Sequence, residues 1–167
     1  MVTYNYSVVK DESNTSIQNV IDRIVDELST SPTIERDIEV AIGAGNFSGF
    51  TIPDGALFPL FNTEFRLIIK AAGDFYPIID FNYSSDQQYT GIDLGSGNPN
   101  VTIRGLRIQY FAVGVKAGLN SHYPIVSNCI INNNRNAGIF FEQCNESVAV
   151  QNIIINGDYG VVARLCK

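Results

Sequence analysis

The hydrophobic positions of the chain first form one helical stripe. Between residues 15 and 28 the apolar side chains recur every three or four residues, at Ile17, Val20, Ile21, Ile24, Val25 and Leu28. This is the spacing of an amphipathic helix. Thr15 and Gln18 have the spacing of a capping box, and Ser16 is a competing N-cap. We therefore expect an N-terminal arm over residues 1–14 and one helix over residues 15–30, whose apolar face lies on a β structure.

From residue 34 onward the pattern changes to short strands separated by Gly, Asn, Asp and Pro. Three of these segments align with one another: Val101–Ile108, Pro124–Ile131 and Val148–Ile155. One aligned position is occupied by Gly105, Asn128 and Asn152, at spacings of 23 and 24 residues. A second is occupied by Gly114, Gly138 and Gly160, at spacings of 24 and 22 residues. Two landmarks with nearly the same period indicate an internal repeat.

A period of this length fits one coil of a parallel β-helix, in which each strand pairs with its counterpart in the next coil about 4.8 Å away. A leucine-rich repeat would need a ladder of leucines and a helix in each repeat, and an antiparallel sandwich has no reason to repeat Asn and Gly in register. Earlier, less regular coils are indicated by Ile38–Ile42, Arg66–Lys70, Ile78–Asp80 and Gly91–Leu94. We predict an all-β protein: a parallel β-helix of about five short coils over residues 34–167, with an N-terminal capping helix.

The composition of the 167-residue chain supports this prediction and draws attention to Asn. Ile and Val together number 35 against 8 Leu, and 17 residues are Asn. β-branched residues favour strands, and Asn tolerates the left-handed conformation of tight corners. Amide side chains at one position of a stacked coil can hydrogen-bond along the axis. We therefore expect a structural amide ladder made of Gln109, Asn132, Asn156, Asn128 and Asn152.

Two segments resemble the pectin-lyase-like right-handed β-helix superfamily. Residues Ser16–Asp22 resemble the start of that family's N-terminal capping helix, and Asn100–Ile108 resembles its coil consensus. The resemblance implies a right-handed coil. It implies little about activity, because the family includes polysaccharide lyases, glycoside hydrolases, phage tailspikes and non-catalytic modules.

The resemblance does not extend to the catalytic motifs of the family. Glycoside hydrolysis needs a pair of carboxylates, and elimination needs Ca²⁺ and a Lys or Arg base. The family's motifs for both reactions are absent from the sequence. We therefore expect no catalytic site, no metal site and no cofactor. An enzyme would have to use Asp80, Asp93 and Arg104, whereas a glycan-binding module would use Arg104, Tyr110 and Tyr123.

Two outward-facing columns change from cationic to apolar toward the C-terminus: Arg107, Ile130 and Ile154 in one, and Lys116, Phe140 and Val162 in the other. Apolar outer faces and a terminal repeat without a polar cap indicate a contact surface. We expect Ile130, Ile154, Phe140 and Val162 to contact a protein partner or a second copy of the chain. Another chain then caps the last coil, or the chain is one piece of a longer polypeptide. The alternative is that a loop or residues 2–10 cover one of the columns.

Charge and processing signals narrow the setting. A formal charge of −6 disfavours a phosphate backbone, so we expect no nucleic-acid partner. No apolar run reaches the roughly 18 residues of a membrane span. The first ten residues lack the features of a signal peptide. We expect synthesis in the cytoplasm, with incorporation into a virion or an exported particle. Cys144 and Cys166 share one position of the repeat, either as a pair of reduced thiols or as a disulfide.

These patterns favour a non-catalytic β-helix module of a larger assembly, such as a viral, phage or cell-surface particle. Two alternatives stay open. One is a polysaccharide lyase or glycoside hydrolase, and the other is a glycan-binding module.

Overall fold

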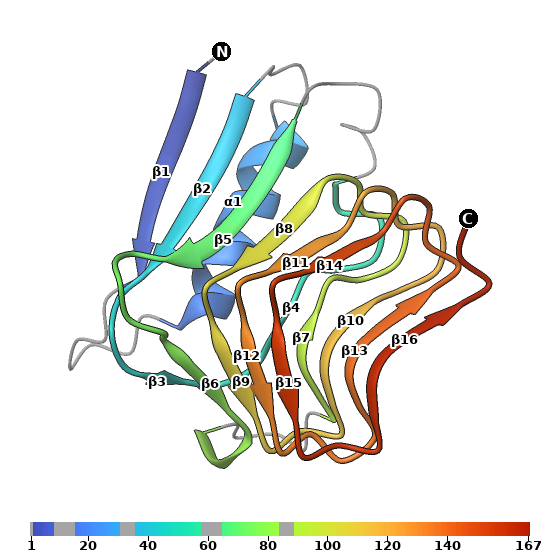
Figure 1. Cartoon of the computed structure of the whole chain (residues 1–167). Helices are drawn as coiled ribbons and strands as arrows, with labels where there is room; N and C mark the ends of the chain where they lie inside the picture. The colour runs from blue at the N-terminus through green and yellow to red at the C-terminus, as the bar shows by residue number, and fades with distance from the viewer. Residues whose placement is uncertain (1, 9–15, 31–35, 58–64, 84–88) are drawn as a thin grey trace.

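A computed structural model of the chain describes residues 2–8, 16–30, 36–57, 65–83 and 89–167. Three parallel sheets enclose one hydrophobic core (Figure 1). The first sheet has the order β1 (Val2–Val8), β2 (Arg36–Ile42), β5 (Arg66–Ala71), β8 (Val101–Arg104), β11 (Ile125–Ser127) and β14 (Val148–Val150). The second has β3 (Asn46–Phe47), β6 (Ile78–Asp80), β9 (Arg107–Gln109), β12 (Ile130–Asn132) and β15 (Ile153–Ile155). The third has β4 (Phe50–Thr51), β7 (Thr90–Asp93), β10 (Val113–Ala117), β13 (Ala137–Glu142) and β16 (Tyr159–Arg164).

One strand from each sheet, taken in chain order, makes one coil, and there are five coils from β2–β3–β4 to β14–β15–β16. A short 3₁₀ turn, Phe81–Tyr83, follows β6. The predicted parallel β-helix of about five coils is therefore confirmed. Coils three and four follow the predicted repeat, because Arg107 pairs with Ile130 and Val115 pairs with Ile139.

Each sheet contributes inward-facing side chains that stack from coil to coil. Ile103 lies opposite Val126 in the first sheet and Ile108 lies opposite Ile131 in the second, all fully buried. In the third sheet Gly91, Gly114, Gly138 and Gly160 occupy one column. A Cβ at Gly138 would lie 2.4 Å from Ile154 Cγ2 and 2.8 Å from Gly160 O. This column is glycine because the isoleucines of the second sheet fill the space.

Four corners recur with left-handed backbone conformation. The corner columns with positive φ are Gly97, Asn120, Gln143, Leu165; Asn100, Tyr123, Glu146; Gly105, Asn128, Gln151; and Tyr110, Asn133, Asn156. The corners turn the chain from one sheet to the next at nearly constant spacing. Asn accounts for several of these positions, which is the expected use of its tolerance for this conformation.

Three buried asparagines join neighbouring coils. Asn134 Oδ1 accepts the Phe111 N–H at 3.0 Å and its Nδ2 donates to Ile108 O at 3.2 Å. Asn152 repeats this geometry one coil later, toward Cys129 N at 2.9 Å and Val126 O at 2.8 Å. Asn98 does the same with Leu57 N, Pro53 O and Leu94 O, each at 2.9 Å. These side chains satisfy corner backbone groups that would otherwise be buried without a partner.

The predicted amide ladder is therefore wrong in part, because the last coil is shifted by one residue from the expected register. Asn152 lies over Cys129 rather than over Asn128, and Asn156 donates to Asn133 Oδ1 at 3.1 Å rather than lying over Asn132. Gln109 and Asn132 do share a column, and Ile155 follows them. Asn132 Oδ1 is buried without a hydrogen-bond partner, because the next residue of its column is apolar.

Helix α1 (Ile17–Thr30) covers the N-terminal end of the core with its predicted apolar face. Ser16 is the N-cap, since its Oγ accepts the Asn19 N–H at 3.1 Å; Thr15 lies outside the described residues. The Gln18 side chain bonds to both backbone groups of Thr51 in β4, at 2.8 and 2.9 Å. This end of the stack is thus closed by the helix.

Residues 2–8 of the predicted arm form β1, which pairs in parallel with β2 and adds a strand to the first sheet. The Tyr6 hydroxyl donates to the Glu27 carboxylate and so joins β1 to the helix. Because β1 lies at the opposite end of the first sheet from β14, the described part of the segment does not cover the C-terminal columns. That alternative is wrong for residues 2–8.

Candidate functional site

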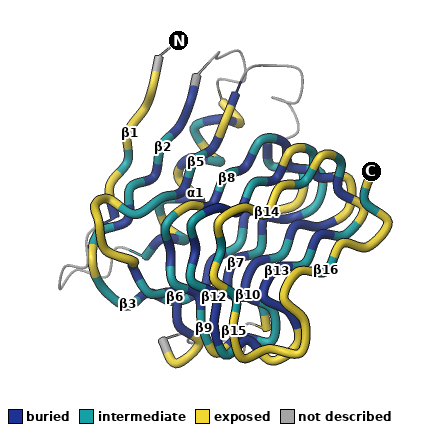
Figure 2. Tube along the Cα trace, viewed as in Figure 1, coloured by how far each residue is buried: buried dark blue, intermediate teal, exposed yellow. Residues whose placement is uncertain are grey.

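The last coil, residues 146–167, is the most exposed apolar region of the described chain. Its strands β14, β15 and β16 are the final members of the three sheets, and no described strand lies beyond them. Figure 2 shows this coil as mostly exposed next to the buried coils behind it. The exposed fraction is 57% for Ile153, 50% for Ile155, 48% for Val161 and 69% for Leu165. Each strand also presents one edge of unpaired backbone groups.

The one-residue shift changes which side chains face outward here. Ile154 pairs with the buried Ile131, not with Ile130, and packs against the core. Its predicted place in the outward column is therefore wrong, and Ile153 takes that position. Ile130 is half-buried on the outer face, as expected.

An apolar groove of about 760 Å³ runs along the outer face of the third sheet. Its lining includes Val113, Ala137, Phe140, Tyr159 and Val162. Lys116, Phe140 and Val162 form one column, as predicted. The Lys116 Nζ lies 3.9 Å from Asp93 Oδ2, which leaves the apolar part of the groove toward the last coil.

The three residues considered for catalysis lie on three different sheets. Asp80 is in β6, Asp93 in β7 and Arg104 in β8. Asp80 accepts hydrogen bonds from Asn82 N and Gln109 Nε2, both at 2.9 Å. Asp93 accepts the Gly95 N–H at 2.9 Å. Both carboxylates hold turns, and the geometry does not bring the three side chains to one place.

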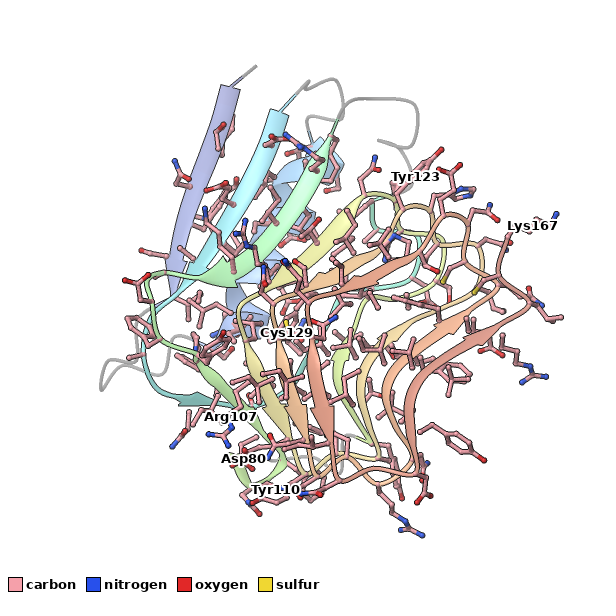
Figure 3. The ribbon with its side chains drawn as sticks, viewed as in Figure 1. Asp80, Arg107, Tyr110, Tyr123, Cys129 and Lys167 are labelled. Carbon is pink, nitrogen blue, oxygen red and sulfur yellow. The ribbon has the colours of Figure 1, made fainter. Side chains whose placement is uncertain are left out.

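The two tyrosines considered for glycan binding also lie apart. Tyr110 and Tyr123 are both half-exposed at left-handed corners, and Figure 3 shows them at opposite ends of the strands. Arg104 instead lines a second groove, of about 750 Å³, on the first sheet. That groove also has Lys70, Phe75 and Tyr76 in its lining. The sequence missed these aromatic residues because they lie in the irregular turn between β5 and β6.

The three cysteines are free thiols, so the reduced-thiol alternative holds for Cys144 and Cys166. Burial raises the pKa of the Cys129 thiol from its usual 9.0 to about 11. Burial likewise raises the pKa of Cys144 to about 11, with a smaller contribution from Cys166 beside it. Both thiols stay protonated at neutral pH, which makes them core groups rather than nucleophiles.

Other chemistry was sought across the described residues. Among them, no group of three or more His, Cys, Asp or Glu side chains is placed to hold a metal ion. His122 lies at a corner with its Nδ1 3.2 Å from Asn145 Nδ2. In the same part of the chain, no helix has the length and apolarity to span a membrane.

Comparison with family models supports the architecture. The model described as a right handed beta helix region matches residues 67–166, more than half of the chain. The chain belongs to the right-handed β-helix family. The handedness expected from the sequence is thereby confirmed for this β-helix. Comparison with curated proteins and with solved structures found no match in either. The function of this β-helix must therefore be argued from its own surface.

Proposed function

We propose that this β-helix is a non-catalytic structural module that joins a larger assembly through its last coil. The observation that carries the proposal is the contrast between the two ends of the stack. The N-terminal end is covered by α1 and hydrogen-bonded through Gln18, whereas the last coil exposes apolar side chains and three strand edges.

Exposure of this coil is costly for an isolated chain. Burying one Ile or Val side chain is worth about 1.5–3 kcal/mol, and the last coil exposes Val148, Val150, Ile153, Ile155, Val161 and Leu165 by 42–69%. Solenoids normally protect such an end with a polar cap, because open edges pair with other chains. A partner that covers the end removes this cost, which favours an interaction module.

The positions of the candidate catalytic residues support a non-catalytic role. A glycosidase needs two carboxyl groups within about 5–10 Å on either side of one bond. Asp80 and Asp93 belong to different sheets and each carries a turn hydrogen bond. A rigid stack with one closed and one open end suits a particle component, such as part of a virion, a phage or a cell surface.

The groove on the first sheet favours a second candidate function, glycan binding. Lys70 and Arg104 lie side by side on paired strands, and Phe75 and Tyr76 line the same groove. Aromatic faces stack on sugar rings, and cations bind their acidic substituents. Tyr76 and Phe75 thus replace Tyr110 and Tyr123 as the aromatic partners of Arg104.

A polysaccharide panel tests the main proposal. The full chain is incubated with neutral and acidic polysaccharides, with and without Ca²⁺, and reducing ends and unsaturated products are measured. We expect no product above that of the heat-denatured chain. Turnover that is lost in Asp80→Asn or Asp93→Asn would show an enzyme instead. Saturable glycan-array binding that is lost in Arg104→Ala but kept in Arg135→Ala, a control outside the groove, would establish the second function.

A further inference from the structure

We propose that the last coil docks on the last coil of a second copy of this chain, end to end about a twofold axis, with the facing strands antiparallel. The inference rests on the proposed function, since it names the occupant of the open end. It follows from the edges, the charge and the size of that end.

The backbone of the last coil is prepared for strand pairing. Ile153 N–H donates to Cys129 O at 2.9 Å, and Ile155 O accepts the Asn133 N–H at 3.1 Å. Both groups therefore point toward the fourth coil. Because backbone groups alternate in direction along a strand, the N–H and C=O of Ile154 point away from the stack. The same alternation applies to Ala149 in β14, since Val148 N–H and Val150 O bond to the fourth coil.

The N-terminal end of another copy cannot satisfy these edges. Gln18 occupies the backbone groups of Thr51 at the edge of β4, and α1 packs against the same strand. Of the described strands at that end, only β1 presents an open edge away from the helix. A head-to-tail contact would thus pair one sheet in three. A second last coil offers all three.

Symmetry gives the direction of the pairs. A twofold axis perpendicular to the stack turns one coil over, so that facing strands run antiparallel. One strand then faces its own copy and the other two exchange. The two ends have the same three-sided outline because they are the same coil. Such an isologous contact closes on itself and yields a dimer instead of a fibre.

The charges of the last coil permit this contact. It carries Glu146 and Asp158 against Arg164 and Lys167, two acidic and two basic residues, so its formal charge is zero. The other 145 residues therefore carry the whole net charge of −6. Arg164 is already paired with Glu142, with 3.3 Å between Nη1 and Oε1. Two copies repel through their other surfaces and meet without repulsion at this end.

The size of the end is also sufficient. The last coil supplies 22 residues to the contact, and a stable interface typically uses about 20–30 residues and about 800 Å² a side. The interface centre would be apolar, formed by the inward-facing Ile154 and Val161 of both copies, with charged residues at its rim. This is the arrangement of homodimer interfaces.

Light scattering across a concentration series tests the inference. We expect the full chain to approach twice its mass of 18.4 kDa as concentration rises. Val161→Lys places a charge where the partner would bury it, although the side chain is 48% exposed in the single chain. This variant should remain a monomer with an unchanged circular dichroism spectrum. Thr3→Lys, on the exposed β1 edge, is the matched control and should dimerise like the parent.

Spin labels give the orientation. In a Cys166→Ser background, labels at Lys167→Cys should lie close together in the dimer. Labels at Asp22→Cys on α1 should be about 40–50 Å apart, the height of two stacks at about 4.8 Å a coil. A monomer at every concentration overturns this inference and leaves the proposed function standing. So does a dimer that Thr3→Lys disrupts and Val161→Lys does not. Polysaccharide turnover overturns the proposed function instead.

Discussion

Gln18 closes the N-terminal end of the stack by pairing with Thr51 as a neighbouring strand would. Its Oε1 accepts the Thr51 N–H at 2.8 Å and its Nε2 donates to Thr51 O at 2.9 Å. One side chain on α1 therefore satisfies an edge of β4 that has no further strand beyond it in the third sheet. Nothing comparable lies on β14, β15 or β16 within the described residues.

Gln18→Ala should lower the free energy of unfolding by about 1–3 kcal/mol, because both Thr51 backbone groups lose a partner in a half-buried place. Urea denaturation of dilute protein measures the change. Asn19→Ala, at the exposed next position of the helix, is the control. Equal losses in the two variants would mean that Gln18 acts only through the helix.

The glycine column gives a matched pair of substitutions. Gly138→Ala should destabilise the fold by about 1–3 kcal/mol, since the added methyl group meets Ile154 and the Gly160 carbonyl. Gly160→Ala has nothing within 4 Å of its Cβ. It should leave stability unchanged or raise it by up to about 1 kcal/mol. Thermal unfolding of both variants separates these outcomes, and a Gly160→Ala variant as unstable as Gly138→Ala would contradict the register of the last coil.

Asn134 should be worth more than its exposed neighbours. Asn134→Ala removes the partners of Phe111 N–H and Ile108 O inside the core, so we expect a loss of about 3 kcal/mol. Asn136 is exposed in the same coil, and Asn136→Ala should cost less than about 0.5 kcal/mol. Urea midpoints of the two variants test this. A small effect at Asn134 would show that water replaces its hydrogen bonds.

Alkaline pH should weaken the fold through Cys129. Its pKa is raised to about 11 in the folded chain, so folding favours the protonated thiol. The stabilisation is fully present below the usual pKa of 9.0 and is lost as pH rises toward about 11. A two-unit shift corresponds to about 2–3 kcal/mol. The difference in unfolding free energy between the parent and Cys129→Ala should therefore shrink between pH 9 and pH 11, and a constant difference would contradict the burial of this thiol.

The sequence predicted the architecture because the repeat has chemically distinct landmarks. Gly114 and Gly138 can stack only where the second sheet fills the interior, and the pair Arg107 and Ile130 marks one outward position. These residues fix coils three and four. The helix was predictable for the same reason, since its apolar stripe has one period and one direction.

The register of the last coil was harder to predict. Ile153, Ile154 and Ile155 are identical, so side-chain chemistry does not tell which of them points inward. The structure keeps a spacing of 23 residues from β12 to β15, and the change of coil length falls before β13 and β16 instead. Asn132, Asn133 and Asn134 present the same ambiguity. Only their contacts show that Asn134 is the one that joins two coils.

The candidate site was predicted in part. Phe140 and Val162 lie in the outward column that the sequence indicated, and their column contains Lys116. The groove that they line also needs Tyr159 and Val113, which come together because a corner glycine shifts the alternation of inward and outward residues. That shift depends on packing between sheets and leaves no signal in one strand alone.

Hydrogen exchange at the last coil tests most directly the claim that its edges pair with a second copy. The amide of Ile154, which points away from the stack, is followed at low and high concentrations of the full chain, with the amides of β1 as the reference. We predict that exchange at Ile154 slows markedly as concentration rises while β1 is unchanged. Exchange at Ile154 that stays equally fast at all concentrations, or protection that appears at β1 instead, would contradict the account.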